Sequence, residues 1–158
     1  MYSTLVTLHL LAAVTWVGGM IFLSLVLAPL VRGRKAAPEF MALFRSAALR
    51  FRPVVWISIA ILLATGPMLL SQRGLSVMKP AAWPVIVNMK LSLVGLLLVL
   101  TLLHDLVLGP RVGHVSAIPE SQRTKGEQIV FKTARWLPRL SLLIALAVVV
   151  VAAVLARS

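Results

Sequence analysis

Two groups of ionisable residues interrupt one apolar segment, 85–108: Lys90 near its start, and His104 followed by Asp105 near its end. Such residues are rare in membrane-spanning segments and usually serve a function. Lys90 and His104 are fourteen residues apart, close to a whole number of helical turns, so both can face one side. Asp105 can orient and charge the imidazole. The alternative is that Lys90 extends its ammonium group to the membrane surface and His104 lies at the interface.

The first apolar segment, 5–31, carries a second histidine. His9, Trp16 and Met20 recur at offsets of seven and eleven residues and therefore share one helix face. His9 enters its helix to a depth of about 6 Å, as does Lys90, so we expect the two to be neighbours in height. His104 lies about 21 Å from Lys90 along the helix, at the opposite membrane face. His9 and His104 of one chain therefore cannot both ligate one haem iron, whereas a haem with a single histidine ligand stays open.

Methionines supply the remaining candidate ligands. Met1, Met68, Met78 and Met89 are expected at the same membrane face as His9. Thioethers and imidazoles suit Cu(I). Met20 lies deeper and His104 at the far end, which outlines a sparse ligand path across the bilayer. The alternative is ordinary packing, because no pair has Met-x-x-Met spacing.

The elements that position these residues follow from composition. Of 158 residues, 60% are hydrophobic and 13% are charged, which predicts an all-α integral membrane four-helix bundle in a single transmembrane domain, 1–158. Four helices are expected at about 5–31, 53–70, 85–108 and 137–156. Prolines at 29, 67 and 110 are expected at or near helix ends, and we find no internal repeat. The lack of cysteine excludes disulfides and thiolate ligands.

Basic residues indicate the topology. Twelve of the sixteen Lys and Arg residues lie in two loops, which the positive-inside rule places in the cytoplasm with both termini outside. Segment 39–52 has apolar residues at helical spacing among arginines, which predicts an amphipathic helix on anionic lipid. This distribution accounts for the net charge of +12 without a nucleic-acid partner. The twelve residues are Arg32, Arg34, Lys35, Arg45, Arg50, Arg52, Arg111, Arg123, Lys125, Lys132, Arg135 and Arg139.

Several motifs resemble the copper-resistance D (CopD) membrane family: HLLAAVTWVGGM from His9 to Met20, Ala28–Pro29, Thr65–Gly66, and the run from Lys90 through HDLVLGPR, which ends at Arg111. The resemblance implies an inner-membrane protein for copper handling or copper ion transport across the cytoplasmic membrane. Its polar positions here are His9, Trp16, Lys90, His104 and Asp105. The candidate copper ligands are His9, Met20, Met68, Met89 and His104.

A looser similarity suggests a haem protein instead. The first-helix histidine and the lysine-to-histidine spacing look like HemJ-type four-helix membrane proteins, which are linked to haem-dependent protoporphyrinogen oxidation. That similarity implies haem b, with His9 as axial ligand, Lys90 pairing a carboxylate, and His104 as a further candidate. No catalytic motif appears, so an enzyme would depend on its cofactor. A noncatalytic assembly subunit is a third alternative. Because side chains normally fill the interior of a four-helix bundle, a path for an ion could be completed at the interface of a homodimer.

Overall fold

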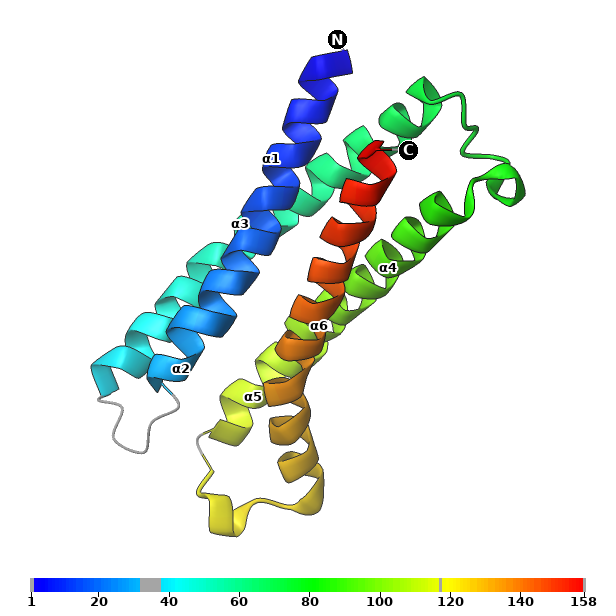
Figure 1. The fold of residues 1–158 in the computed structure, drawn as a ribbon. Helices are drawn as coiled ribbons and strands as arrows, with labels where there is room; N and C mark the ends of the chain where they lie inside the picture. Colours follow the sequence, from blue (N-terminus) through cyan, green and yellow to red (C-terminus); the bar gives the residue numbers. More distant parts are fainter. Residues whose placement is uncertain (1, 32–37, 117, 158) are drawn as a thin grey trace. The chain divides into compact units, whose positions relative to one another are not determined.

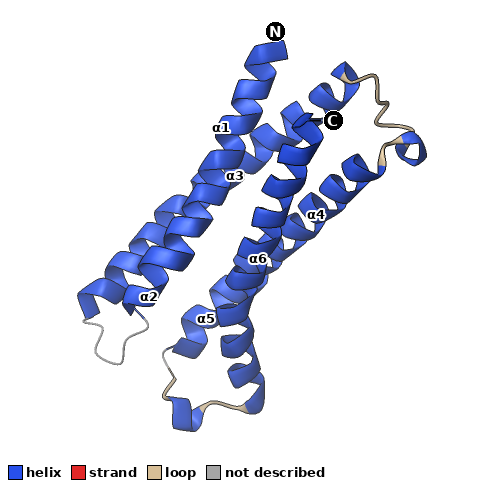
Figure 2. Cartoon of the chain, in the orientation of Figure 1, coloured by secondary structure: helices blue, strands red, loops and turns tan. Residues whose placement is uncertain are grey.

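The computed structural model describes residues 2–31, 38–116 and 118–157, and in these ranges the chain is helical without a strand (Figure 2). The helices are α1 (Tyr2–Ile21), α2 (Ala28–Val31), α3 (Pro38–Gln72), α4 (Val85–Leu102), α5 (Gly109–Ser116) and α6 (Lys125–Arg157). Four helical runs are long and apolar enough to cross a membrane: Tyr2–Leu30, Glu39–Gln72, Val85–Gly113 and Lys125–Arg157. The predicted all-α membrane fold with four spanning helices is confirmed. Arg32, Arg34 and Lys35 lie outside the described residues.

The chain forms two compact units, Met1–Pro84 and Val85–Ser158, and each is built around a pair of long helices. In the first unit α1 packs along α3 (Figure 1). Their direction follows from two contacts: His9 meets Thr65, and Gly19 meets Phe51. Residue numbers increase along α1 in the direction in which they decrease along α3, so the two helices are antiparallel. In the second unit α4 packs against α6.

Local chemistry sets the ends of the long helices. After α3, Gly74 has a φ of 73°, a left-handed conformation that glycine adopts without a Cβ clash. Its N–H bonds to Ser71 O at 2.9 Å and the next N–H, of Leu75, to Leu70 O at 3.2 Å, the pattern of a Schellman cap. At the start of α6, Thr124 N donates to Glu127 Oε2 at 2.7 Å while Glu127 N donates to Thr124 Oγ1 at 3.4 Å. This reciprocal pair is a capping box.

Pro29, Pro67 and Pro110 lie near the ends of their helical runs, as expected from sequence, but they do not stop the helices. Pro53 and Pro67 lie inside α3, and the helical path continues past Pro110 through α5. Helices in a bilayer tolerate proline because neighbouring groups and local changes of hydrogen-bond register satisfy the freed carbonyls. As a result, the expected surface segment 39–52 and the expected span 53–70 belong to one continuous helix, α3.

Two π-turns show how such a change of register occurs. The first, Phe22–Leu27, closes with Ala28 N–H bonded to Leu23 O, just before Pro29. The second, Leu103–Leu108, closes with Gly109 N–H bonded to His104 O, just before Pro110. A proline has no N–H and its ring collides with the carbonyl four residues earlier. Widening the preceding turn to a five-residue bond relieves that collision without ending the helix.

The matching π-turns reveal an internal repeat, which corrects the expectation that the sequence contains none. Both boundaries of the turn shift by 81 residues, from 22 to 103 and from 27 to 108. The sequences there are SLVLAP at 24–29 and DLVLGP at 105–110. The most deeply buried large residues of the two helices obey the same shift, Trp16 at 4% exposed and Leu97 at 2%. Each unit therefore begins with the same helix, π-turn and proline.

Candidate functional site

His9 is held by a hydroxyl of the neighbouring helix. Its Nδ1 lies 2.7 Å from Thr65 Oγ1, and the threonine hydroxyl also donates to Ile61 O at 2.7 Å. Thr65 is buried, with 6% of its surface exposed, and His9 is half-buried. The imidazole passes over Gly66, whose missing Cβ would lie 3.8 Å from His9 Cε1. Thr65 and Gly66, near the end of α3, thus hold the imidazole ring in place.

This bond selects one tautomer of the neutral imidazole. A threonine hydroxyl has a single hydrogen, and Thr65 directs it to the Ile61 carbonyl. The bond to His9 therefore needs Nδ1 as the donor, so that Nε2 carries the ring's lone pair. A histidine that donates through one nitrogen while presenting the other as a base has the arrangement of most metal-ligating histidines.

The predicted face of α1 is confirmed by burial. Trp16 is buried, while His9 and Met20, on the same face, are half-buried. Gly19 on this helix allows the closest approach, because a Cβ there would overlap the Phe51 ring of α3. Gly18, by contrast, has no atom within 4 Å of where its Cβ would lie. Trp16 is the most buried residue of this face, with 4% of its surface exposed, and its role in the site stays a prediction.

The methionines differ in their surroundings. Met20 is half-buried on the His9 face, whereas Met68 is 55% exposed on α3, three residues after Thr65. Met89 is 47% exposed on α4, in the second unit. Among the described residues, no group of three or more His, Cys, Asp or Glu side chains could hold a metal ion. The soft donors among the described residues of the first unit are therefore the His9 imidazole and the thioethers of Met20, Met41, Met68 and Met78.

His104 and Asp105 lie within the second π-turn. His104 Nδ1 is 3.6 Å from Asp105 Oδ1, an ion-pair distance when the imidazole is protonated but too long for a good hydrogen bond. The His104 side chain is 45% exposed and that of Asp105 17%. An ordinary α-helix points adjacent side chains about 100° apart. In this structure the side chains of the two consecutive residues nevertheless lie within ion-pair distance of each other.

Lys90 is half-buried on α4 and stands 81 positions after His9. This is the shift that relates the two π-turns, so His9 and Lys90 occupy equivalent positions of the repeated helix. That the two residues lie at equal depth in the membrane, and that they are neighbours, stays a prediction.

Sequence reasoning missed the role of Thr65. The available signal was the register of an antiparallel hairpin, in which a residue near the start of the first span meets one near the end of the second. A buried threonine bonded to the carbonyl four residues earlier is common in membrane helices and carries no functional meaning alone. Thr65 gains a functional meaning only from the His9 imidazole, which lies within hydrogen-bond distance of its hydroxyl.

A comparison with protein-family models finds a match to "Copper resistance protein D" over residues 45–155. The matched range contains Thr65, Lys90, His104 and Asp105, and it begins after His9, Trp16 and Met20. No curated protein and no solved structure matches the chain. None of these comparisons supports the haem alternative.

Proposed function

The chain belongs to the copper resistance protein D family, and from this membership we propose that it binds Cu(I) in the membrane with His9 as the first ligand. The family makes it a copper-resistance membrane protein. Binding at a defined residue and movement of copper across the bilayer are the further steps of the proposal.

The observation that carries the proposal is the bond between His9 Nδ1 and Thr65 Oγ1. It assigns the proton of a neutral imidazole to Nδ1, so that Nε2 is the nitrogen through which the ring would bind a metal. The Thr65 hydrogen is directed to Ile61 O, which leaves the hydroxyl oxygen to accept from Nδ1. Mutating the hydrogen-bond partner of a metal-ligating histidine commonly lowers metal affinity by about 10- to 100-fold.

Thioethers are the matching second donors. Met68 follows Thr65 by three residues, about one turn of α3, and its side chain is exposed. Met20 lies three turns deeper on the helix face that carries His9. Cu(I) accepts sulfur and imidazole ligands at low coordination number, which suits a cargo ion that must be released again. In this proposal copper is the transported substrate, and His104 with Asp105 receives it at the other membrane face.

Cu(I) affinity of the purified full-length protein tests the proposal, measured by competition with a chromophoric Cu(I) chelator. We expect His9→Ala to weaken Cu(I) binding at least about tenfold. Met68→Leu should weaken it less, because another donor can replace a thioether more readily than it can replace the imidazole. Met41→Leu is the matched control, because Met41 is exposed and lies 24 residues before Thr65 on α3, about 36 Å along the helix. Unchanged affinity in His9→Ala would overturn the site. A Soret band that disappears in His9→Ala would replace copper with haem.

A further inference from the structure

An open groove of about 480 Å³ lies in the second unit, between α5 and the beginning of α6. Its volume falls within the range of small-ligand sites. Part of its wall is aliphatic, and Val115 is buried there. The lining residues are Pro110, Arg111, Val115, Thr124, Gly126, Glu127 and Val130. The proposed copper site uses none of them.

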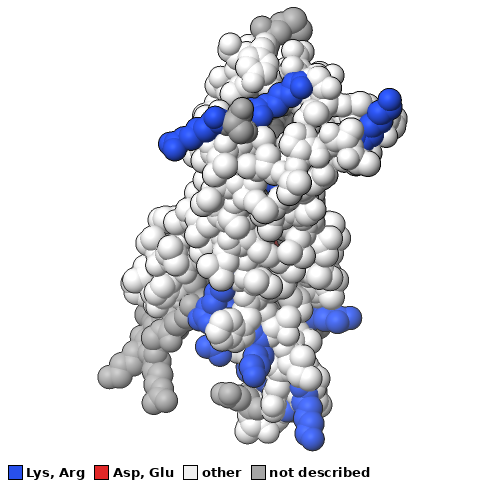
Figure 3. Space-filling view, turned by 45° about the vertical axis from the view of Figure 1, so that its right-hand side comes forward, with Lys and Arg blue, Asp and Glu red and all other residues white. Residues whose placement is uncertain are grey.

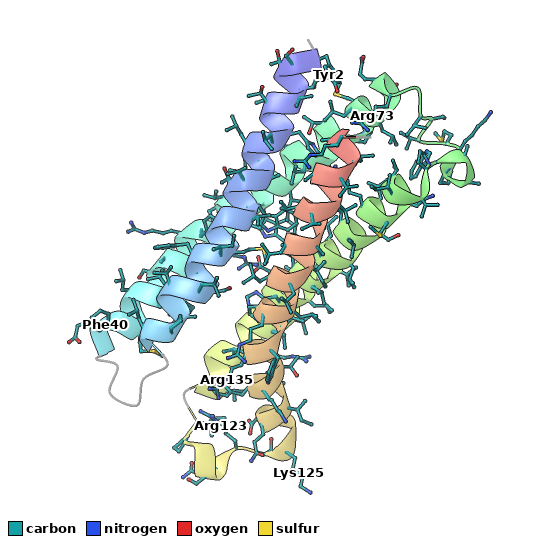
Figure 4. The ribbon with its side chains drawn as sticks, in the orientation of Figure 1. Tyr2, Phe40, Arg73, Arg123, Lys125 and Arg135 are labelled. Carbon is teal, nitrogen blue, oxygen red and sulfur yellow. The ribbon has the colours of Figure 1, made fainter. Side chains whose placement is uncertain are left out.

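Arg123, which directly precedes the lining residue Thr124, is held in place by two contacts. Arg123 Nε donates to Ile118 O at 3.0 Å, and its guanidinium lies 4.4 Å from the centre of the Phe131 ring. Arg135 approaches the same ring at 5.8 Å. Figure 4 shows Arg123, Lys125 and Arg135 at the loop-side end of α6. A guanidinium that is already oriented loses less conformational freedom when it binds an anion.

The charge of this region is strongly positive. Between residues 109 and 139 the sequence carries six Lys or Arg and two Glu. One of these, Glu127, accepts hydrogen bonds from the Thr124 backbone and hydroxyl at 2.7 and 2.8 Å, which caps α6. Figure 3 shows Lys and Arg side chains gathered towards helix ends while most of the visible surface between them is uncharged.

An exposed tryptophan marks the level of the membrane surface on α6. Trp136 is 59% exposed, and Arg139 lies over its ring at 4.7 Å. Tryptophan beside arginine at the end of an apolar helix is typical of the layer where headgroups meet acyl chains. The groove therefore lies within about three turns of that layer along α6, on the basic side.

We propose that this groove binds an anionic phospholipid, with the phosphate at Arg111 and Arg123 and an acyl chain along Val115 and Val130. A soluble anion would match the cations but not the aliphatic wall. A neutral lipid would match the wall but not the excess of positive charge that remains beside Glu127. Anionic lipid satisfies both, because basic residues near an anionic leaflet are attracted to its headgroups.

Native mass spectrometry of the full-length protein tests this with phosphatidylglycerol and phosphatidylcholine of identical acyl chains. We expect phosphatidylglycerol to be retained at least fivefold more than phosphatidylcholine, and Arg111→Gln and Arg123→Gln each to reduce that preference. Lys79→Gln removes the same charge from the loop before α4 and should leave the preference unchanged.

Two results would overturn the proposal. One is equal retention of the two lipids by the unaltered protein, or a preference that Arg111→Gln and Arg123→Gln do not change. The other is displacement of phosphatidylglycerol by glycerol phosphate at equal concentration, which would assign the groove to a soluble anion. Far-UV circular dichroism verifies the fold of each variant, and if Arg123→Gln loses helix, Arg111→Gln alone decides.

Discussion

Replacing Thr65 with valine tests whether the hydroxyl orients His9 for copper. Valine has nearly the shape of threonine, so the change removes the 2.7 Å bond to Nδ1 and leaves most of the packing of this buried position. The Nδ1–H is then left without its acceptor, and either nitrogen can carry the proton. We expect Cu(I) affinity to fall about 10- to 100-fold, or about 1.4 to 2.8 kcal/mol.

Two companion variants isolate that bond. Thr65→Ser retains the hydroxyl and should keep Cu(I) affinity close to that of the original protein. Thr101→Val removes a bond of the same kind, because Thr101 Oγ1 donates to Leu97 O at 2.8 Å, but in the second unit. It should leave the affinity unchanged.

Chelator competition on all three variants gives the answer. An affinity in Thr65→Val equal to that of the original protein would refute the argument from the tautomer, even with His9 as a ligand. Loss of affinity in Thr65→Ser as large as in Thr65→Val would refute it as well, because the hydroxyl would then not be the active group.

Three further predictions concern the fold and its orientation. Gly19→Ala should lower the free energy of unfolding by about 1 to 3 kcal/mol, because its Cβ collides with the ring packed there, whereas Gly18→Ala should cost little; thermal unfolding in detergent compares them. Thr124→Ala should cost about 1 kcal/mol by removing the cap of α6, and an unchanged unfolding midpoint would contradict the capping box. A cysteine at Ser76 should react with an impermeant thiol reagent from outside the cell and one at Ser121 only after lysis, and the reverse pattern would invert the topology.

Much of the architecture can be predicted from the sequence, because it depends on composition and one-dimensional patterns. An apolar run of about 20 residues spans a bilayer whatever its neighbours are, so the four helices and the membrane fold follow directly. The face of α1 with His9, Trp16 and Met20 follows from helical periodicity, and the burial of Trp16 agrees with it. The motifs quoted above were enough to indicate the CopD family, which the family comparison confirms.

Contacts between helices and the effect of proline needed the tertiary structure. Proline removes one donor, and the structure shows that the helix continues past it, with a widened turn before Pro29 and Pro110. The repeat of SLVLAP as DLVLGP is present in the sequence, but its structural meaning comes from the two π-turns that share the 81-residue shift.

The surroundings of His9 also depend partly on sequence and partly on the packing of helices. Periodicity placed the imidazole on the inner face of α1, but Thr65 is 56 residues away in sequence, and its hydroxyl meets Nδ1 only because α1 and α3 pack antiparallel in one register. A shift of α3 by one residue would rotate the hydroxyl by about 100° and break the bond. Sequence determined that this chain is a helical membrane protein with a histidine facing inward, and packing decided which nitrogen that histidine presents.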